Sequence, residues 1–175
     1  MHKGYSLFFL FLIICFSCNT TQKGHINSTN PKYESWYAYG GDAGGNRFVD
    51  AAQISLENIQ NLKVAWTYRT GELGQDSKIK EKLTFEATPI HFQGKLFLST
   101  SYGKVIALNP STGEELWTFD PKINRKSSFS ELTSRGVSAW TDMNLSEKES
   151  CKHCILIGTI NAKLIILDAE TGQVC

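Results

Sequence analysis

The sequence predicts an all-β protein assembled from repeated antiparallel sheet units. Residues 95–121 contain three short apolar runs, rich in β-branched and aromatic side chains, that alternate with two turns. The turns fall at residues 101–103 and 109–113, where Gly103 and Gly113 supply left-handed backbone and Pro110 presets φ. Short apolar runs separated by such turns are typical of a β-meander.

The meander occurs twice. Residues 154–175 align with the first copy at a constant offset of 59 residues through strand, turn and strand. The matched pairs are Thr100 and Thr159, Lys104 and Lys163, Leu108 and Leu167, Thr112 and Thr171, and Gly113 and Gly172. A single unit of three or four strands cannot bury both of its faces, so the repeat predicts a stack or ring of sheets.

Composition and local pattern complete the expected fold. The 175 residues are 41% hydrophobic with a net charge of +1, which is a globular composition and excludes nucleic acid as a bulk partner. Residues 54–62 predict one or two helical turns with Ser55 as N-cap. Residues 64–68, 85–90 and 135–140 predict strands, and the polar stretch 71–82 predicts a surface loop.

His91 and His153 have no second ligand at metal spacing and are expected on the surface.

The first 35 residues have the pattern of an export signal and tether. Residues 7–16 form an apolar run of ten behind a basic start, too short to span a bilayer but typical of a signal-peptide core. Ser17-Cys18 then favours a lipoprotein signal ending at 1–18, with Cys18 lipidated. Cys15 stands where such signals usually carry Leu, so an ordinary secretory signal is the alternative. Residues 19–35 predict a flexible tether, residues 36–175 the folded domain, and the whole an exported protein.

The cysteines at 151, 154 and 175 suit an oxidising compartment. Ile155 follows the Cys151-Lys-His-Cys154 motif where haem attachment requires histidine, and one such motif is only half of a zinc site. A local disulfide and a bond from one of these cysteines to a distant one are both open. Cys175 is the last residue of the sequence, and its partner is not fixed by the pattern.

Several blocks make the chain resemble the N-terminal part of the pyrroloquinoline-quinone (PQQ) dependent alcohol and sugar dehydrogenases. They are residues 36–42 (WYAYGGD), 46–48 (NRF), 54–66, 70–71, 85–89 (FEATP), 135–137 (RGV) and the two repeats. The alcohol-oxidising branch carries adjacent cysteines shortly before the RG motif. Here Phe129-Ser130 occupies that region, which favours the glucose-dehydrogenase-like branch.

The resemblance implies an eight-bladed β-propeller, of which this chain holds about two blades. Trp117 is expected to dock on the next blade, and residues 64–68 to complete the last one. The family binds PQQ over a calcium ion, with a catalytic aspartate as base. The calcium ligands and that aspartate are expected beyond Cys175, so the chain is expected to be an N-terminal fragment that is inactive alone and has no catalytic residue.

Three residues are the expected cofactor contacts. Within the family the glutamate matching Glu86 contacts the quinone, the arginine matching Arg135 binds a carboxylate, and the threonine matching Thr159 touches the cofactor. Each has another interpretation. Glu86 can be an exposed residue of a blade rim, Arg135 can form a surface salt bridge, and Thr159 can pack as a β-branched repeat residue like Thr100.

The function implied is an exported PQQ-dependent dehydrogenase. It would oxidise a sugar or alcohol and pass electrons to a membrane quinone or cytochrome, from the periplasm or from a lipid anchor at the outer or cell membrane. The alternative is a non-catalytic propeller that serves as a protein-binding outer-membrane scaffold lipoprotein. A truncated product without a function of its own is a third interpretation.

Overall fold

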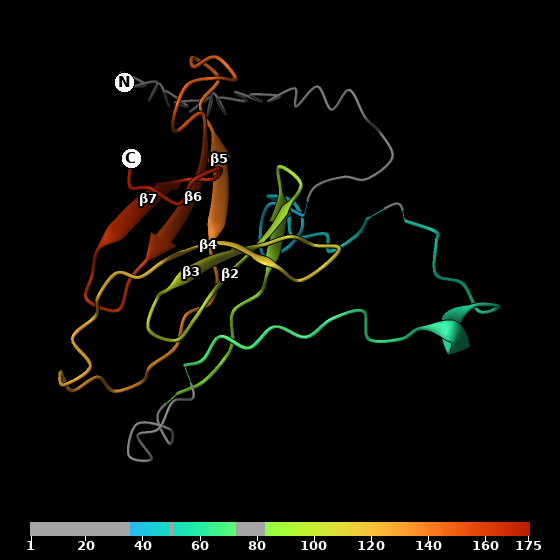
Figure 1. The fold of residues 1–175 in the computed structure, drawn as a ribbon, viewed down its shortest axis with the longest axis horizontal. Coiled ribbons are helices and arrows are strands. Elements are labelled where there is room, and N and C mark those ends of the chain that lie inside the picture. Colours follow the sequence, from blue (N-terminus) through green and yellow to red (C-terminus); the bar gives the residue numbers. More distant parts are fainter. Residues whose placement is uncertain (1–35, 50, 73–82) are drawn as a thin grey trace, which may run out of the picture.

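The computed structural model describes residues 36–49, 51–72 and 83–175, which contain two antiparallel β-sheets packed on each other (Figure 1). The expected signal and tether, and residues 73–82 of the expected surface loop, lie outside the described residues. The described part contains a single 3-10 turn and no longer helix, as the sequence predicted. No helix among the described residues has the length and apolar character to cross a membrane.

The first sheet has four strands in sequence order, each paired with the next. They are β1 (Ile90–Phe92), β2 (Lys95–Ser99), β3 (Val105–Leu108) and β4 (Glu115–Phe119). The predicted meander supplies β2 to β4, and its first turn is closed by the Gly103 amide, which donates to the Thr100 carbonyl at 2.8 Å. The expected strand at 85–90 begins only at Ile90, because Pro89 has no amide hydrogen to donate to a ladder.

The second sheet repeats the same design. Its strands are β5 (Ser138–Thr141), β6 (His153–Gly158) and β7 (Leu164–Asp168), in the order β5-β6-β7. The turn between β6 and β7 is closed by the Ala162 amide on the Thr159 carbonyl at 3.0 Å, matching the turn after Thr100. After β7 the chain turns back, and Val174 forms an isolated bridge with Leu167.

The main core lies between the two sheets. Because side chains alternate across a strand, each sheet presents one apolar face to the other. The buried residues at this interface include Ile90, Phe97, Val105 and Ala107 of the first sheet and Ile155, Ile157 and Leu167 of the second. These seven are at most 1% exposed, and burial of each larger side chain contributes about 1.5–3 kcal/mol.

Tryptophans attach successive repeats to one another. The Trp117 indole of β4 lies over Gly172, where an added Cβ would be 2.6 Å from Cε3, and its Nε1 donates to the Ala169 carbonyl at 3.3 Å. This confirms the expected docking of Trp117. Trp66 does the same one repeat earlier, on Gly113, with Nε1 donating to the Pro110 carbonyl at 3.0 Å.

The segment before the first sheet differs from the prediction. Residues 64–68 lie outside every described ladder, and Trp66 and Tyr68 instead pack their side chains on the outer face of the first sheet. That this segment completes a last blade stays a prediction. The helical turn is η1 (Ile59–Asn61), with Asn58 at the N-cap position rather than Ser55. Figure 1 shows η1 apart from both sheets.

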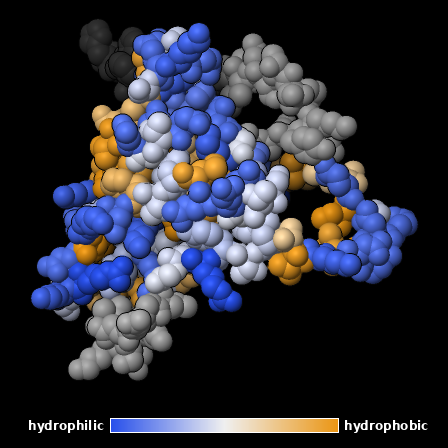
Figure 2. All heavy atoms as spheres, viewed as in Figure 1, coloured by the Kyte–Doolittle hydropathy of each residue, from blue (hydrophilic) through white to orange (hydrophobic). Residues whose placement is uncertain are grey.

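Apolar surface remains on the outer side of the second sheet and along the segment that contains η1. Trp140 and Leu164 are 52% and 69% exposed, and Leu56 and Val64 are 90% and 83% exposed. Figure 2 shows hydrophobic surface in both regions. Each region has a face that a further neighbour can cover.

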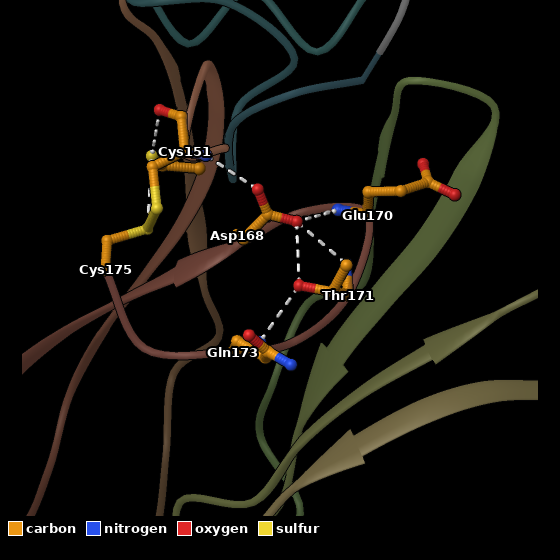
Figure 3. Close-up of a disulfide and its surroundings, with 7 residues drawn as sticks. Cys151, Asp168, Glu170, Thr171, Gln173 and Cys175 are labelled. Atoms are coloured by element: carbon orange, nitrogen blue, oxygen red, sulfur yellow. Dashed lines mark hydrogen bonds between the residues drawn. A yellow bond between two sulfur atoms is a disulfide. The ribbon is translucent and has the colours of Figure 1, made fainter. Parts of the chain in front are cut away.

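The structure resolves the cysteine pairing that the sequence left open. Cys151 and Cys175 form a disulfide with their Cα atoms 6.0 Å apart, and Cys154 is a buried free thiol. The bond joins the loop before β6 to the strand-like return after β7 (Figure 3). It therefore ties the return segment covalently to the loop before β6.

Candidate functional site

Glu86 and Arg135, 49 residues apart in the sequence, meet in a salt bridge with 2.8 Å between Oε2 and Nη1. Two extended segments, just before β1 and just before β5, bring them together by running parallel. Thr88 and Gly136 form a parallel bridge, and the Thr88 amide donates to the Arg135 carbonyl at 3.3 Å. The pair therefore joins the entrance of the first sheet to the entrance of the second.

Gly136 makes this close approach possible. Its φ is +131°, a conformation that L side chains rarely adopt, and an added Cβ would lie 3.0 Å from the Thr88 carbonyl oxygen. A larger residue at this position would push the two segments apart. The glycine that follows Arg135 thus has a structural reason that is separate from ligand binding.

The salt bridge leaves most hydrogen-bond donors of the Arg135 guanidinium available to other partners. The Arg135 side chain is 79% exposed and that of Glu86 is 33% exposed, so the salt bridge contributes only about 0–1 kcal/mol to stability. A guanidinium has five N–H donors in a planar fork that can hold a carboxylate with two parallel bonds. The surface salt bridge that one interpretation of Arg135 predicts is therefore present. Its partner, Glu86, is the other expected cofactor contact, so the geometry is also compatible with carboxylate binding by Arg135.

Thr159 lies at the same end of the second sheet as Arg135. β5 and β6 pair Ser138 with Leu156, and Arg135 and Thr159 each lie three residues beyond that pair on the same side. Thr159 is 9% exposed, and its hydroxyl donates to Asn161 Oδ1 at 2.5 Å. No hydrogen bond or ion pair joins Thr159 to the Glu86–Arg135 pair within the described residues.

A carboxyl-binding arrangement in the first repeat was not predicted. Glu72 is only 7% exposed, which corrects its assignment to a surface loop. The Thr100 hydroxyl donates to Glu72 Oε1 at 2.5 Å, and the Tyr102 amide lies 3.3 Å from both carboxyl oxygens. The sequence offers no local signal for this contact, since Glu72 stands in a polar stretch and its partners are about thirty residues away.

Neither of the two histidines in the described part of the chain, His91 and His153, belongs to a cluster of metal-binding side chains. No group of three or more metal-binding side chains occurs among residues 36–49, 51–72 and 83–175. His91 is half-buried, and His153 is also half-buried rather than free on the surface. His153 Nε2 lies 2.9 Å from Glu147 Oε2, and its Nδ1 lies 3.1 Å from the Thr141 hydroxyl. These contacts fasten the loop between β5 and β6, which is a structural role.

Comparison with known proteins identifies relatives of the chain. The model for the PQQ family, "Glucose/ethanol/alcohol dehydrogenase, beta-propeller domain", matches residues 36–175. Quinoprotein glucose dehydrogenase A of Acinetobacter calcoaceticus is 36% identical over 151 residues, covering 80% of this chain and 19% of that protein. Quinoprotein glucose dehydrogenase of Escherichia coli (strain K12) is 36% identical over 146 residues, covering 81% and 18%.

A solved structure agrees with the sequence matches. Quinohemoprotein alcohol dehydrogenase from Comamonas testosteroni superposes with a TM-score of 0.62 at 29% identity, covering 81% of this chain and 18% of that one. This chain thus spans about a fifth of the length of the relatives it matches. Its two sheets form part of a β-propeller. The chain belongs to the family of PQQ-dependent glucose and alcohol dehydrogenase β-propellers.

Proposed function

We propose that this chain is the N-terminal part of an exported PQQ-dependent dehydrogenase that oxidises a sugar or an alcohol. Electrons would pass to a membrane quinone or cytochrome. The observation that carries the proposal is the Glu86–Arg135 pair, joined at 2.8 Å with the guanidinium 79% exposed, in a chain of this family. The relatives reported above carry dehydrogenase names, which favours an enzyme over a scaffold.

The residues present fit a ligand with carboxylate groups. Arg135 offers a charged fork, and two parallel hydrogen bonds from it would orient a planar carboxylate. Glu86 holds that fork in place from the adjacent segment. When bound, the quinone supplies hydride acceptance, which no amino-acid side chain offers. The chain's own residues contribute binding and orientation.

The first repeat shows what the Thr159 position can do. Thr100, its repeat equivalent, donates its hydroxyl to the Glu72 carboxyl group, and the amide two residues on lies beside the same group. The local frame is the same at Thr159, because the Lys163 amide reaches the Thr159 hydroxyl at 3.2 Å just as the Lys104 amide reaches that of Thr100. We therefore assign the Thr159 hydroxyl as a second hydrogen-bond donor, to a carboxylate or carbonyl oxygen of the ligand, which would replace Asn161 Oδ1 as the acceptor.

The test is a titration of PQQ into a longer protein that carries this chain as its N-terminal part. Arg135→Ala removes a charge-assisted bidentate contact worth about 1.5–3 kcal/mol, so quinone affinity should fall roughly ten- to a hundredfold. Quenching of protein fluorescence measures this affinity without turnover. Equal affinities of wild type and Arg135→Ala would overturn the assignment.

Matched variants separate the specific contact from general effects. Arg47→Ala removes an equal charge from an arginine that lies over the Tyr39 ring at 4.8 Å, and should leave quinone affinity unchanged. Thr159→Val should cost about one neutral hydrogen bond, roughly 1 kcal/mol. Thr159→Ser keeps the hydroxyl and should bind like wild type. A Thr159→Ser loss as large as that of Thr159→Val would assign Thr159 to packing.

We also propose that the protein is exported and lipid-anchored at Cys18. The support is the apolar run at 7–16 followed by Ser17-Cys18. Labelling of cells with a radioactive fatty acid should mark the wild-type chain and not Cys18→Ser. A labelled Cys18→Ser chain, or an unlabelled wild type, would oppose the anchor. Signal cleavage at another residue in the unlabelled wild type would identify an ordinary secretory signal.

A further inference from the structure

All three cysteines of the folded part meet at one end of the second sheet, where β6 begins and β7 ends. Cys151 and Cys175 form the disulfide, and the Cys154 sulfur lies 3.9 Å from the Cys175 sulfur. Cys154 is on β6, directly opposite Asp168 of β7. The third sulfur therefore lies next to one particular sulfur of the existing bond.

Asp168 holds the Cys151 end of the disulfide and the turn that leads to Cys175 (Figure 3). Its Oδ2 accepts the Cys151 amide at 2.7 Å, which holds the backbone where Cys151 takes a left-handed φ of 61°. Its Oδ1 accepts the amides of Glu170 and Thr171 at 3.0 and 2.8 Å, and so fixes the turn that returns the chain to the sheet. The Cys175 amide then donates a hydrogen bond to the Ile166 carbonyl of β7 at 2.9 Å. The sulfur arrangement is built by folded elements rather than by a free tail.

Access to the three sulfurs is unequal. Cys154 is 2% exposed, Cys151 is half-buried and Cys175 is exposed. A buried thiol is shielded from oxidants and alkylating reagents in the solvent. The disulfide beside it is the reaction partner that the fold presents to Cys154.

We propose that Cys175 can bond to either of two partners, Cys151 or Cys154, and that these three cysteines undergo thiol–disulfide exchange. The Cys154 thiol loses its proton, and its thiolate attacks the Cys175 sulfur. A Cys154–Cys175 bond forms, the Cys151–Cys175 bond breaks, and its electron pair leaves on the Cys151 sulfur, which takes up a proton. The exchange consumes no oxidant or reductant. It moves the covalent tether from the loop before β6 to β6 itself.

The surroundings make the exchange slow at neutral pH. Burial raises the pKa of the Cys154 thiol, and the carboxylates of Asp168 on β7 and Asp142 after β5 raise it further. The neighbouring Lys152 ammonium is directed elsewhere, onto the Leu145 carbonyl at 2.6 Å. Only the thiolate attacks, so the exchange rate should rise about tenfold for each pH unit below the thiol pKa.

Trypsin separates the three cysteines and so reports the pairing. Cleavage after Lys148, Lys152 and Lys163 yields peptides 149–152, 153–163 and 164–175, with one cysteine each. The full chain, expressed in an oxidising compartment, is incubated at pH 7 and at pH 9. It is then quenched with acid and denaturant, alkylated with N-ethylmaleimide, and digested. Mass spectrometry counts the two linked pairs, 149–152 with 164–175 and 153–163 with 164–175.

The proposal predicts that the second pair forms about a hundredfold faster at pH 9 than at pH 7. In Cys151→Ser, Cys154 and Cys175 should be linked directly. Cys154→Ser is the matched control and should keep only the first pair at both pH values. Wild type that keeps only the first pair at both pH values would overturn the proposal. So would a Cys151→Ser chain in which both remaining cysteines are alkylated. The wild-type comparison needs no variant to fold.

Discussion

Gly172→Ala should be far more destabilising than Gly94→Ala, although both glycines have nearly the same backbone conformation. Gly172 has φ +73° and Gly94 has φ +70°, so each alanine carries the left-handed penalty of about 1–2 kcal/mol. Nothing lies within 4 Å of a Cβ at Gly94, whereas a Cβ at Gly172 would meet Trp117 at 2.6 Å. That clash should add about 1–3 kcal/mol, typical of an overpacked core.

Urea unfolding followed by circular dichroism measures this difference, because that signal is also present in variants that lack Trp117. Trp117 is half-buried at the junction of the two sheets, so loss of its packing should destabilise the sheets. The unfolding midpoint of Gly172→Ala should fall below that of Gly94→Ala, with the slope against urea unchanged. A second pair of variants in a Trp117→Leu background removes the indole. There, Gly172→Ala should cost no more than Gly94→Ala, which gives a coupling energy between the indole and the glycine.

Equal midpoints for the two single alanine variants would refute the reasoning. So would a Gly172→Ala penalty that persists in full without the indole, because the cost would then come from the backbone alone. The comparison tests the claim that a tryptophan seated on a glycine turn attaches one repeat to the next. Gly113 offers a replicate, since a Cβ there would lie 2.5 Å from Trp66.

Three further predictions rest on other parts of the chain. Glu72→Ala should lower stability by about 2 kcal/mol in urea unfolding, because Thr100 and Tyr102 lose a buried acceptor; an unchanged midpoint would contradict this. Burial alone would raise the pKa of Asp168, but hydrogen bonds from surrounding amides and a hydroxyl lower it on balance. The stability that Asp168 contributes is therefore present above the unfolded pKa near 3.8 and is lost as pH falls through the lower folded value. Acid unfolding monitored by circular dichroism measures this loss of stability, which should be smaller in Asp168→Asn. Residues 18–175 expressed alone should self-associate through the apolar surface that their described part leaves exposed, and monomeric elution would contradict that.

The sequence predicted the strands well because their signals are local. Alternating apolar residues and glycine turns occur within a few residues of each other, so β2, β3, β6 and β7 fall where the pattern placed them. The start of β1 shifted because Pro89 cannot donate to a ladder. Residues 64–68 have strand composition, yet their aromatic side chains find their partners by docking on a sheet face rather than by joining a ladder.

In the candidate site, too, some residues could be predicted from the sequence and others could not. Glu86, Arg135 and Thr159 came from a family resemblance, and geometry then placed the first two in contact. Glu72 could not be found, because its polar neighbours indicate exposure and its burial depends on Thr100 in a distant turn. The disulfide was equally beyond the sequence, since three cysteines allow three pairings and only the return of the chain after β7 selects one.

Burial in this fold is decided by neighbours more than by local sequence. Val105 of the first sheet and Leu164 of the second occupy equivalent positions of the repeat, 59 residues apart, and both are apolar. Val105 is 0% exposed because the second sheet covers it, whereas Leu164 is 69% exposed. The repeat therefore encodes a sheet with two apolar faces, and a sheet of this kind is stable when a neighbour packs on each face. Within the ring that the family forms, the outer face of the second sheet is the place where the next repeat would pack, with the same chemistry that joins the two sheets here.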